Sequence, residues 1–180
     1  MTSGGWTARY ADLAGKAAVL AGTSSVLGEV ARVLADNGVM AALVVNDREL
    51  VDAATGYAAE IGVASIGLVA DPAERGTWER VSAHIEQRLG PIDIAVAIAP
   101  PEVRREIVTA LLPDMAARRR GVIVEAGASV EPLPMPTGLR HRAVSGAAAV
   151  DARDLAAAIA LCVSDVLSAT AVDIRLGVSD

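Results

Sequence analysis

The sequence has no phenylalanine and contains few of the residues that most often carry catalytic chemistry. Its 180 residues include two tyrosines, two histidines, one cysteine and one lysine, and arginine supplies the rest of the 16 basic side chains. The single cysteine, Cys162, excludes a disulfide within the chain and a thiolate metal site, and it fits a reducing compartment. The two histidines, His84 and His141, are too far apart in the sequence to suggest a zinc site. We therefore expect no metal.

Basic charge, aromatic residues and long apolar runs are also scarce. The formal net charge is −6 and aromatic residues make up 2% of the chain, which disfavours a nucleic-acid surface. No apolar run reaches the roughly 18 residues of a membrane span, and the N-terminus lacks the apolar core of a signal peptide. We expect a soluble, cytoplasmic protein that binds neither nucleic acid nor membrane.

Short apolar segments alternate with amphipathic ones along the whole chain, of which 53% is hydrophobic. Near-continuous apolar strands that alternate with helices predict a parallel sheet covered on both faces. We therefore expect one doubly wound, mostly parallel Rossmann-type sheet of about six strands over residues 1–180, with residues 1–12 as a flexible arm. The strands are expected at 16–21, 40–45, 64–69, 92–98, 122–125 and 171–176, and the helices at 26–36, 49–61, 77–89, 102–119 and 151–167. The proline-rich stretch 131–136 is expected to be an irregular loop.

The order and spacing of several short motifs resemble the short-chain dehydrogenase/reductase (SDR) family over residues 13–130 and 151–177. Five places carry the resemblance: Leu13-Ala14-Gly15-Lys16 before the first strand, Ala21 to Gly28 at the glycine-rich loop, Asp71 after the third strand, Leu89 to Ile94, and Leu112-Pro113-x-Met115 followed by Gly121 to Val124. The resemblance implies a nicotinamide dinucleotide in the crevice beyond the strands and a hydride transfer to or from an alcohol or ketone.

The dinucleotide site implied by the resemblance is incomplete. Its candidate residues are Gly22 and Gly28 in the glycine-rich loop, Asp47 after the second strand, and Asp71. Asp47 would accept a hydrogen bond from a ribose hydroxyl, which favours NAD over NADP. Val26 replaces the middle glycine, and a branched side chain there is expected to crowd the phosphates. We therefore expect no cofactor, or NAD if the altered loop still binds.

The catalytic residues implied by the resemblance are missing. The family uses a Tyr-x-x-x-Lys pair, and neither Tyr10 nor Tyr57 is followed four positions later by lysine. Ala128 stands where the family has a serine that polarises the substrate carbonyl, with Ser129 one step further along. Counting forward from Ala128 places the pair at His141 and Ser145, and the arginines that flank His141 suggest a solvent-exposed histidine. No catalytic residue is predicted, and the chain has no room for the lid that usually closes over the substrate.

Helices 102–119 and 151–167 carry apolar residues around most of their circumference, which suggests burial on nearly every side. In the resembling family, this region and the closing strand, here 171–176, form subunit interfaces. We therefore predict a non-catalytic subunit that assembles with itself or with an intact SDR acting on an acyl-CoA or another bulky hydroxy or keto substrate. Two alternatives stay open: an NAD-dependent oxidoreductase with a non-standard site around His141, and a sensor that binds a nucleotide or thioester.

Overall fold

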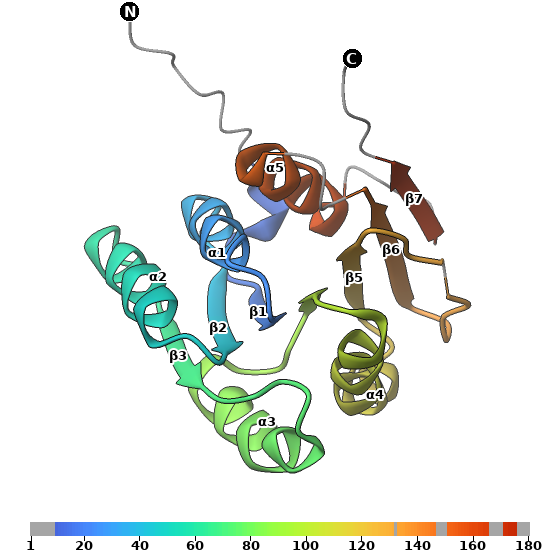
Figure 1. The fold of residues 1–180 in the computed structure, drawn as a ribbon, viewed down its shortest axis with the longest axis horizontal. Helices are drawn as coiled ribbons and strands as arrows, with labels where there is room; N and C mark the ends of the chain where they lie inside the picture. Colours follow the sequence, from blue (N-terminus) through green and yellow to red (C-terminus); the bar gives the residue numbers. More distant parts are fainter. Residues whose placement is uncertain (1–9, 132, 147–150, 166–170, 176–180) are drawn as a thin grey trace, which may run out of the picture.

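The structure, a computed structural model, describes residues 10–131, 133–146, 151–165 and 171–175. In these residues one parallel sheet holds seven strands in the order β3-β2-β1-β4-β5-β6-β7 (Figure 1). The strands are β1 (Ala17–Gly22), β2 (Met40–Val45), β3 (Ser65–Val69), β4 (Ile94–Ile98), β5 (Gly121–Gly127), β6 (Leu139–Ser145) and β7 (Ala171–Arg175). The doubly wound, parallel Rossmann-type fold expected from the sequence is confirmed.

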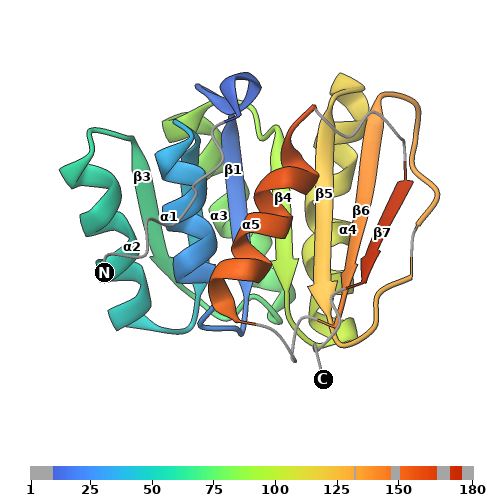
Figure 2. The same cartoon turned by 90° about the horizontal axis from the view of Figure 1, so that it is seen from above.

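Helices cover both faces of the sheet and enclose two separate apolar layers (Figure 2). One layer lies under α1 (Leu27–Asp36), α2 (Arg48–Glu60) and α5 (Ala152–Val163), and the other under α3 (Arg75–Leu89) and α4 (Pro101–Arg118). The central strands β1 and β4 are buried along their whole length, because helices cover them on both sides.

The N-terminal segment begins with a short 3-10 helix, η1 (Ala11–Leu13), whose Leu13 is fully buried. The backbone N–H of Tyr10 donates to Asn37 Oδ1 at 2.6 Å. The arm expected over residues 1–12 therefore overlaps a structured segment at residues 10–12, and residues 1–9 lie outside the described part of the chain.

The seventh strand, β6, was not expected from the sequence. Its charged residues in the sequence Leu-Arg-His-Arg suggest an exposed segment, but Arg140 is partly buried and both His141 and Arg142 are 0% exposed. Alternate residues of a strand point to opposite faces of the sheet, so the two arginines face α5 while His141 faces the α4 side. The expectation of a surface histidine at His141 is therefore wrong.

The connection between β5 and β6 contains no helix among its described residues, although both strands run parallel. Parallel neighbours usually need a crossover of a dozen or more residues, most often a helix. Here residues 128–138 make the connection, and the proline-rich stretch lies within it as expected. Hydrogen bonds tie the loop to the end of β6: the Val130 N–H donates to Ser145 Oγ at 3.2 Å, and the Gly146 N–H donates to the Ala128 carbonyl at 3.2 Å.

Most of the large apolar side chains of α4 and α5 are buried within this one chain. Ile107 and Met115 of α4 and Ile159 of α5 are 0% exposed. Most of the apolar surface of these helices is therefore covered without a second subunit, and their role in assembly stays a prediction. Helix α5 also ends at Val163, earlier than expected: Ser164 is extended, its carbonyl accepts from Arg140, and Arg140 pairs with Asp165. None of the described helices is both long and apolar enough to span a membrane.

Gly22 offers a direct test of how closely β1 and β4 approach. A Cβ at Gly22 would lie 2.1 Å from the Ile98 carbonyl oxygen, so Gly22→Ala must push the ends of these central strands apart. We expect this substitution to lower the free energy of unfolding by about 1–3 kcal/mol or more. Gly56→Ala is the matched control, because a Cβ at this exposed position in α2 meets nothing within 4 Å. The control is expected to gain about 0.5–1 kcal/mol from the higher helix propensity of alanine. Urea unfolding measures both, and equal effects would contradict the close approach.

Candidate functional site

The carboxyl ends of the strands open onto two cavities. In open α/β sheets ligands bind at this edge, where the strand order reverses, which here is between β1 and β4. The first, the β2 cavity, has a volume of about 410 Å3 and is lined by Gly22, Thr23, Ser24, Ser25, Val45, Asn46, Asp47, Leu50, Asp71 and Pro72. The second, the β5 cavity, has a volume of about 450 Å3 and is lined by Thr23, Ser24, Ile98, Ala99, Pro100, Pro101, Arg104, Ala126, Gly127, Ala128, Ser129 and Leu155.

Three of the four predicted cofactor residues lie together in the β2 cavity: Gly22, Asp47 and Asp71. Both carboxylates also serve local structure, since Asp47 caps α2 by accepting from the Leu50 N–H at 3.0 Å and Asp71 accepts from the Ala73 N–H at 2.9 Å. Gly28 is not in the wall. A Cβ at Gly28 would lie 2.6 Å from Leu50 Cδ1, so this glycine permits α1 and α2 to pack closely.

Val26 lies outside both cavity walls. It is partly buried and packs against the apolar layer under α1, α2 and α5. Its backbone N–H donates to Ser24 Oγ at 3.3 Å, which holds the turn before α1. The branched side chain that was expected to crowd the phosphates is therefore directed into the core, and Thr23 and Ser24 form the wall shared by the two cavities.

The β5 cavity has an apolar wall with one charged side chain, Arg104, in its described lining. Arg104 lies in the first turns of α4 and is 5% exposed. Its guanidinium donates from Nη1 to the Ala99 carbonyl at 2.8 Å and from Nη2 to the Ser129 carbonyl at 3.1 Å. One side chain therefore joins the loop after β4 to the loop after β5, at the two sides of the cavity.

Behind the cavity wall, Arg104, Glu125 and His141 form a buried network, which we call the Arg104–Glu125–His141 network. Arg104 Nε donates to Glu125 Oε1 at 3.2 Å, and His141 Nε2 lies 2.8 Å from Glu125 Oε2. The other ring nitrogen, Nδ1, accepts from the backbone N–H of Leu133 at 3.0 Å. Because Nδ1 accepts, the ring proton is on Nε2 and is donated to Glu125. Both nitrogens of His141 are thus engaged inside the protein.

The environment of Glu125 favours its ionised form. Burial by itself raises the pKa of this carboxyl group, but the hydrogen bond from His141, together with the charge and hydrogen bond of Arg104, outweighs burial and holds the pKa below its ordinary value of 4.5. Glu125 is therefore a buried carboxylate at neutral pH. Removing one partner of such a pair leaves an uncompensated buried charge.

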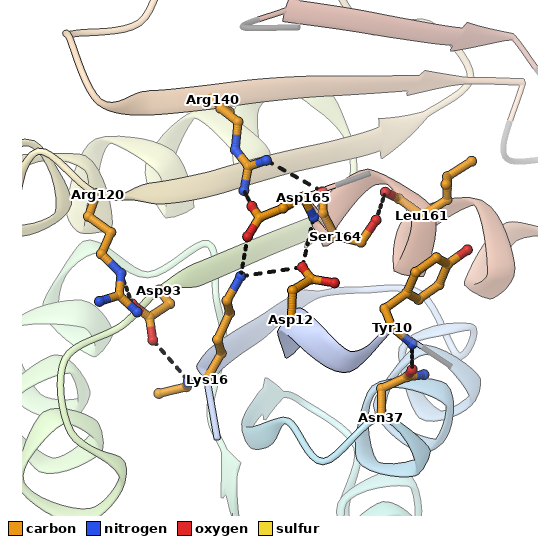
Figure 3. Close-up of polar contacts among 11 residues, drawn as sticks. Tyr10, Asp12, Lys16, Asn37, Asp93, Arg120, Arg140, Leu161, Ser164 and Asp165 are labelled. Atoms are coloured by element: carbon orange, nitrogen blue, oxygen red, sulfur yellow. Dashed lines mark hydrogen bonds and ion pairs between the residues drawn. The ribbon is translucent and has the colours of Figure 1, made fainter. Parts of the chain in front are cut away.

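The tyrosines and the lysine, which would be needed to form a Tyr–Lys pair, lie away from both cavities. Tyr57 donates its hydroxyl to Asp36 between α2 and α1, and Tyr10 lies beside η1. Lys16, the sole lysine, lies just before β1 at the opposite edge of the sheet, where it pairs with Asp12 at 3.6 Å and Asp165 at 3.4 Å (Figure 3). Neither tyrosine nor the lysine is part of either cavity wall.

The remaining candidate side chains have structural roles. Cys162 is fully buried, and burial raises the pKa of its thiol to about 11 despite the nearby charge of Arg142, so the thiol stays protonated at neutral pH. His84 is exposed on α3. Asp93 accepts from the Ala17 N–H and pairs with Arg120 at 3.1 Å, which joins the starts of β1, β4 and β5 (Figure 3). The described residues include no cluster of histidine, cysteine and carboxylate groups able to hold a metal.

Glu125→Gln tests the Arg104–Glu125–His141 network through its pH dependence. The substitution leaves Arg104 buried without its carboxylate, and we expect it to lower the free energy of unfolding at neutral pH by about 3–5 kcal/mol. Because the folded-state pKa of Glu125 is lowered, its contribution is fully present above the unfolded value of 4.5 and is lost as the pH falls through the folded value. The gap between wild type and variant should therefore narrow below about pH 5 in urea unfolding curves. Exposed Glu102→Gln on α4 is the control, and a gap that stays constant on acidification would contradict the assignment.

No protein-family model and no curated protein matches the amino-acid sequence. Solved structures do match, over nearly the whole chain. A metagenomic short-chain oxidoreductase solved with NADP is 17% identical, with a TM-score of 0.74, and the match covers 93% of this chain and 100% of that one. A short-chain dehydrogenase/reductase from Mycobacterium marinum is 15% identical, with a TM-score of 0.78 and coverages of 92% and 94%. An NADH-dependent reductase solved with NAD is 15% identical, with a TM-score of 0.74 and coverages of 92% and 96%.

These structures agree with the sequence motifs in pointing to one fold family. The crevice between β1 and β4, the parallel sheet and the helices on both faces are those expected from the motifs at residues 13–28 and 89–94. At these identities the likeness concerns the fold, and on that basis the chain has the Rossmann-type fold of the short-chain dehydrogenases/reductases.

Proposed function

We propose that this protein is a non-catalytic subunit with the SDR fold, which keeps the crevice of an oxidoreductase and supports an intact SDR. The observation that carries the proposal is the placement of Tyr10, Tyr57 and Lys16, which are all the tyrosines and lysines of the sequence and lie outside both cavities. Hydride transfer to a ketone needs a proton donor within hydrogen-bond reach of the carbonyl oxygen. The β5 cavity has no tyrosine, histidine, lysine or carboxylic acid among its described side chains, and the two carboxyl groups of the β2 cavity, Asp47 and Asp71, accept hydrogen bonds from backbone N–H groups.

The polar groups that do line the β5 cavity are poor substitutes for that acid. Thr23, Ser24 and Ser129 offer only hydroxyl groups, which need a neighbouring base to exchange protons. Arg104 stays protonated and is fixed by Glu125. His141 is fully buried with both nitrogens engaged, so an active site around this residue has no support in the geometry.

The residues of the β2 cavity fit the adenosine half of a dinucleotide. The turn from Gly22 to Ser25 leads into the N-terminus of α1, Val26 is turned away, and Asp47 stands at the end of β2. Asp47 would accept from ribose hydroxyls and would repel a 2′-phosphate, so a dinucleotide bound there is NAD rather than NADP. When bound, NAD would supply a hydride acceptor, and the role of this chain is limited to holding and orienting it.

The assembly part of the proposal rests on likeness to the SDR family, in which the equivalent helices and closing strand meet a neighbouring subunit. Here these elements are α4, α5 and β7. The intact partner would supply the serine, tyrosine and lysine and would act on an acyl-CoA or another bulky hydroxy or keto compound. A sensor that binds a nucleotide or thioester without a partner is the second candidate, and the β5 cavity of about 450 Å3 is the observation that favours it.

Turnover and co-purification test this proposal together. The purified protein is expected to give no NADH or NADPH oxidation above background with a panel of ketones and acyl-CoA thioesters, because the described lining of the β5 cavity offers no acid to protonate a ketone. Isolation of the tagged protein from its native host is expected to yield a full-length SDR in a fixed ratio. Turnover that survives further purification would overturn the non-catalytic assignment. Recovery of the chain alone would overturn the partner and favour the sensor, which thermal shifts with nucleotides and thioesters would then identify.

A further inference from the structure

Arg104 occupies an unusual position, because it is a nearly buried cation in the wall of an otherwise apolar cavity. Apart from Arg104 and the hydroxyls of Thr23, Ser24 and Ser129, every described side chain in that wall is apolar or absent, as at Gly127. A charge at 5% exposure is costly unless paired, and Arg104 has its partner, Glu125, behind the wall rather than in it.

The guanidinium has hydrogen-bond capacity to spare. It carries five N–H groups, and three of them are engaged with Glu125, the Ala99 carbonyl and the Ser129 carbonyl. Among the described residues no acceptor takes the other two, one on each terminal nitrogen. Arg104 is part of the cavity wall, and these two N–H groups are the hydrogen-bond donors that a ligand in the β5 cavity would use.

The backbone is shaped to admit this side chain. A Cβ at Gly127 would lie 2.3 Å from Arg104 Nη1, so a larger residue at the end of β5 would displace the guanidinium from this position. Glu125 and the two carbonyls hold the group in one orientation before any ligand arrives. A donor pair that is already ordered binds its acceptor with little further loss of conformational entropy.

The composition of the wall selects the chemistry of the ligand. One cation, itself paired with a carboxylate, matches a group of single negative charge rather than a phosphate dianion, and two N–H groups on neighbouring nitrogens match the two oxygens of a carboxylate. The rest of the ligand faces Ile98, Ala126 and Leu155, which are buried apolar side chains. A volume of about 450 Å3 suits a small molecule.

We propose that the β5 cavity binds a small, largely apolar carboxylic acid, whose carboxylate is held by the terminal nitrogens of Arg104 and whose apolar chain lies against the ends of β4 and β5. This inference goes beyond the scaffold role proposed above and requires neither turnover nor a partner. Turnover and co-purification assays test the non-catalytic subunit, whereas ligand binding tests the carboxylic-acid site, so either proposal can fail without the other.

Isothermal titration of the full-length protein with octanoate, octanamide and octanol tests the carboxylate. Octanoate is expected to bind at least about tenfold more tightly than the two neutral ligands of equal chain length, because only octanoate forms charge-assisted hydrogen bonds with Arg104. Equal binding of all three, or no octanoate binding at millimolar concentration, would overturn the proposal.

Variants locate the site. The double variant Arg104→Gln/Glu125→Gln removes both charges of the buried pair together, so neither is left uncompensated, and it is expected to lose the preference for octanoate. Arg105→Gln is the matched control, since Arg105 is exposed on the same helix. Ala128→Trp provides an independent variant, because it fills the cavity from an exposed wall position without altering the pair. It should weaken octanoate binding at least about tenfold, and unchanged binding in Ala128→Trp would overturn the assigned site.

Discussion

The Arg104–Glu125–His141 network is the interaction on which the carboxyl edge of this sheet depends. It joins α4, β5 and β6, and through backbone groups of Ala99, Ser129 and Leu133 it also fixes the loops that surround the β5 cavity. A helix normally covers the crossover between two parallel strands. Between β5 and β6 no such helix is present among the described residues, and the loop held by this network makes the connection instead. The loop after β5 also forms one side of the β5 cavity.

The two cavities at this edge are built on different groups. The β2 cavity is built from turns that the strand ends require in any case, such as the Asp47 cap of α2 and the close packing at Gly22 and Gly28. The β5 cavity is instead lined by a fixed cation, Arg104. A fixed guanidinium can recognise a ligand, but it does not exchange protons. This property of Arg104 supports the ligand-binding role proposed for the β5 cavity.

Most of the fold could be predicted from the sequence because its strands are continuous apolar runs bounded by glycine, proline and aspartate. Strand β6 was missed because its charged letters suggest solvent, whereas the side chains of His141 and Arg142 are buried. Burial of these groups depends on partners from β5 and α5, which lie far away in the sequence, so no local pattern reports it. The early end of α5 is likewise not visible locally, since the residues after the helix contact Arg140 and Lys16, which lie far away in the sequence.

The sequence indicated candidate residues for the β2 cavity but not for the β5 cavity. Gly22, Asp47 and Asp71 were found because their types and spacing follow a known loop, while Arg104 and Glu125 follow none. One signal was present: a glutamate inside the apolar run of β5 must find a cationic partner if it is buried.

The most direct test of the Arg104–Glu125–His141 network is to determine the tautomer of His141. Nitrogen-15 chemical shifts and long-range proton–nitrogen couplings of the folded protein at neutral pH report it. The account predicts a ring with its proton on Nε2 and an unprotonated Nδ1, held in slow exchange with solvent, because Glu125 accepts from the one and Leu133 donates to the other. A proton on Nδ1, or a ring that averages rapidly between the two forms, would contradict the Arg104–Glu125–His141 network.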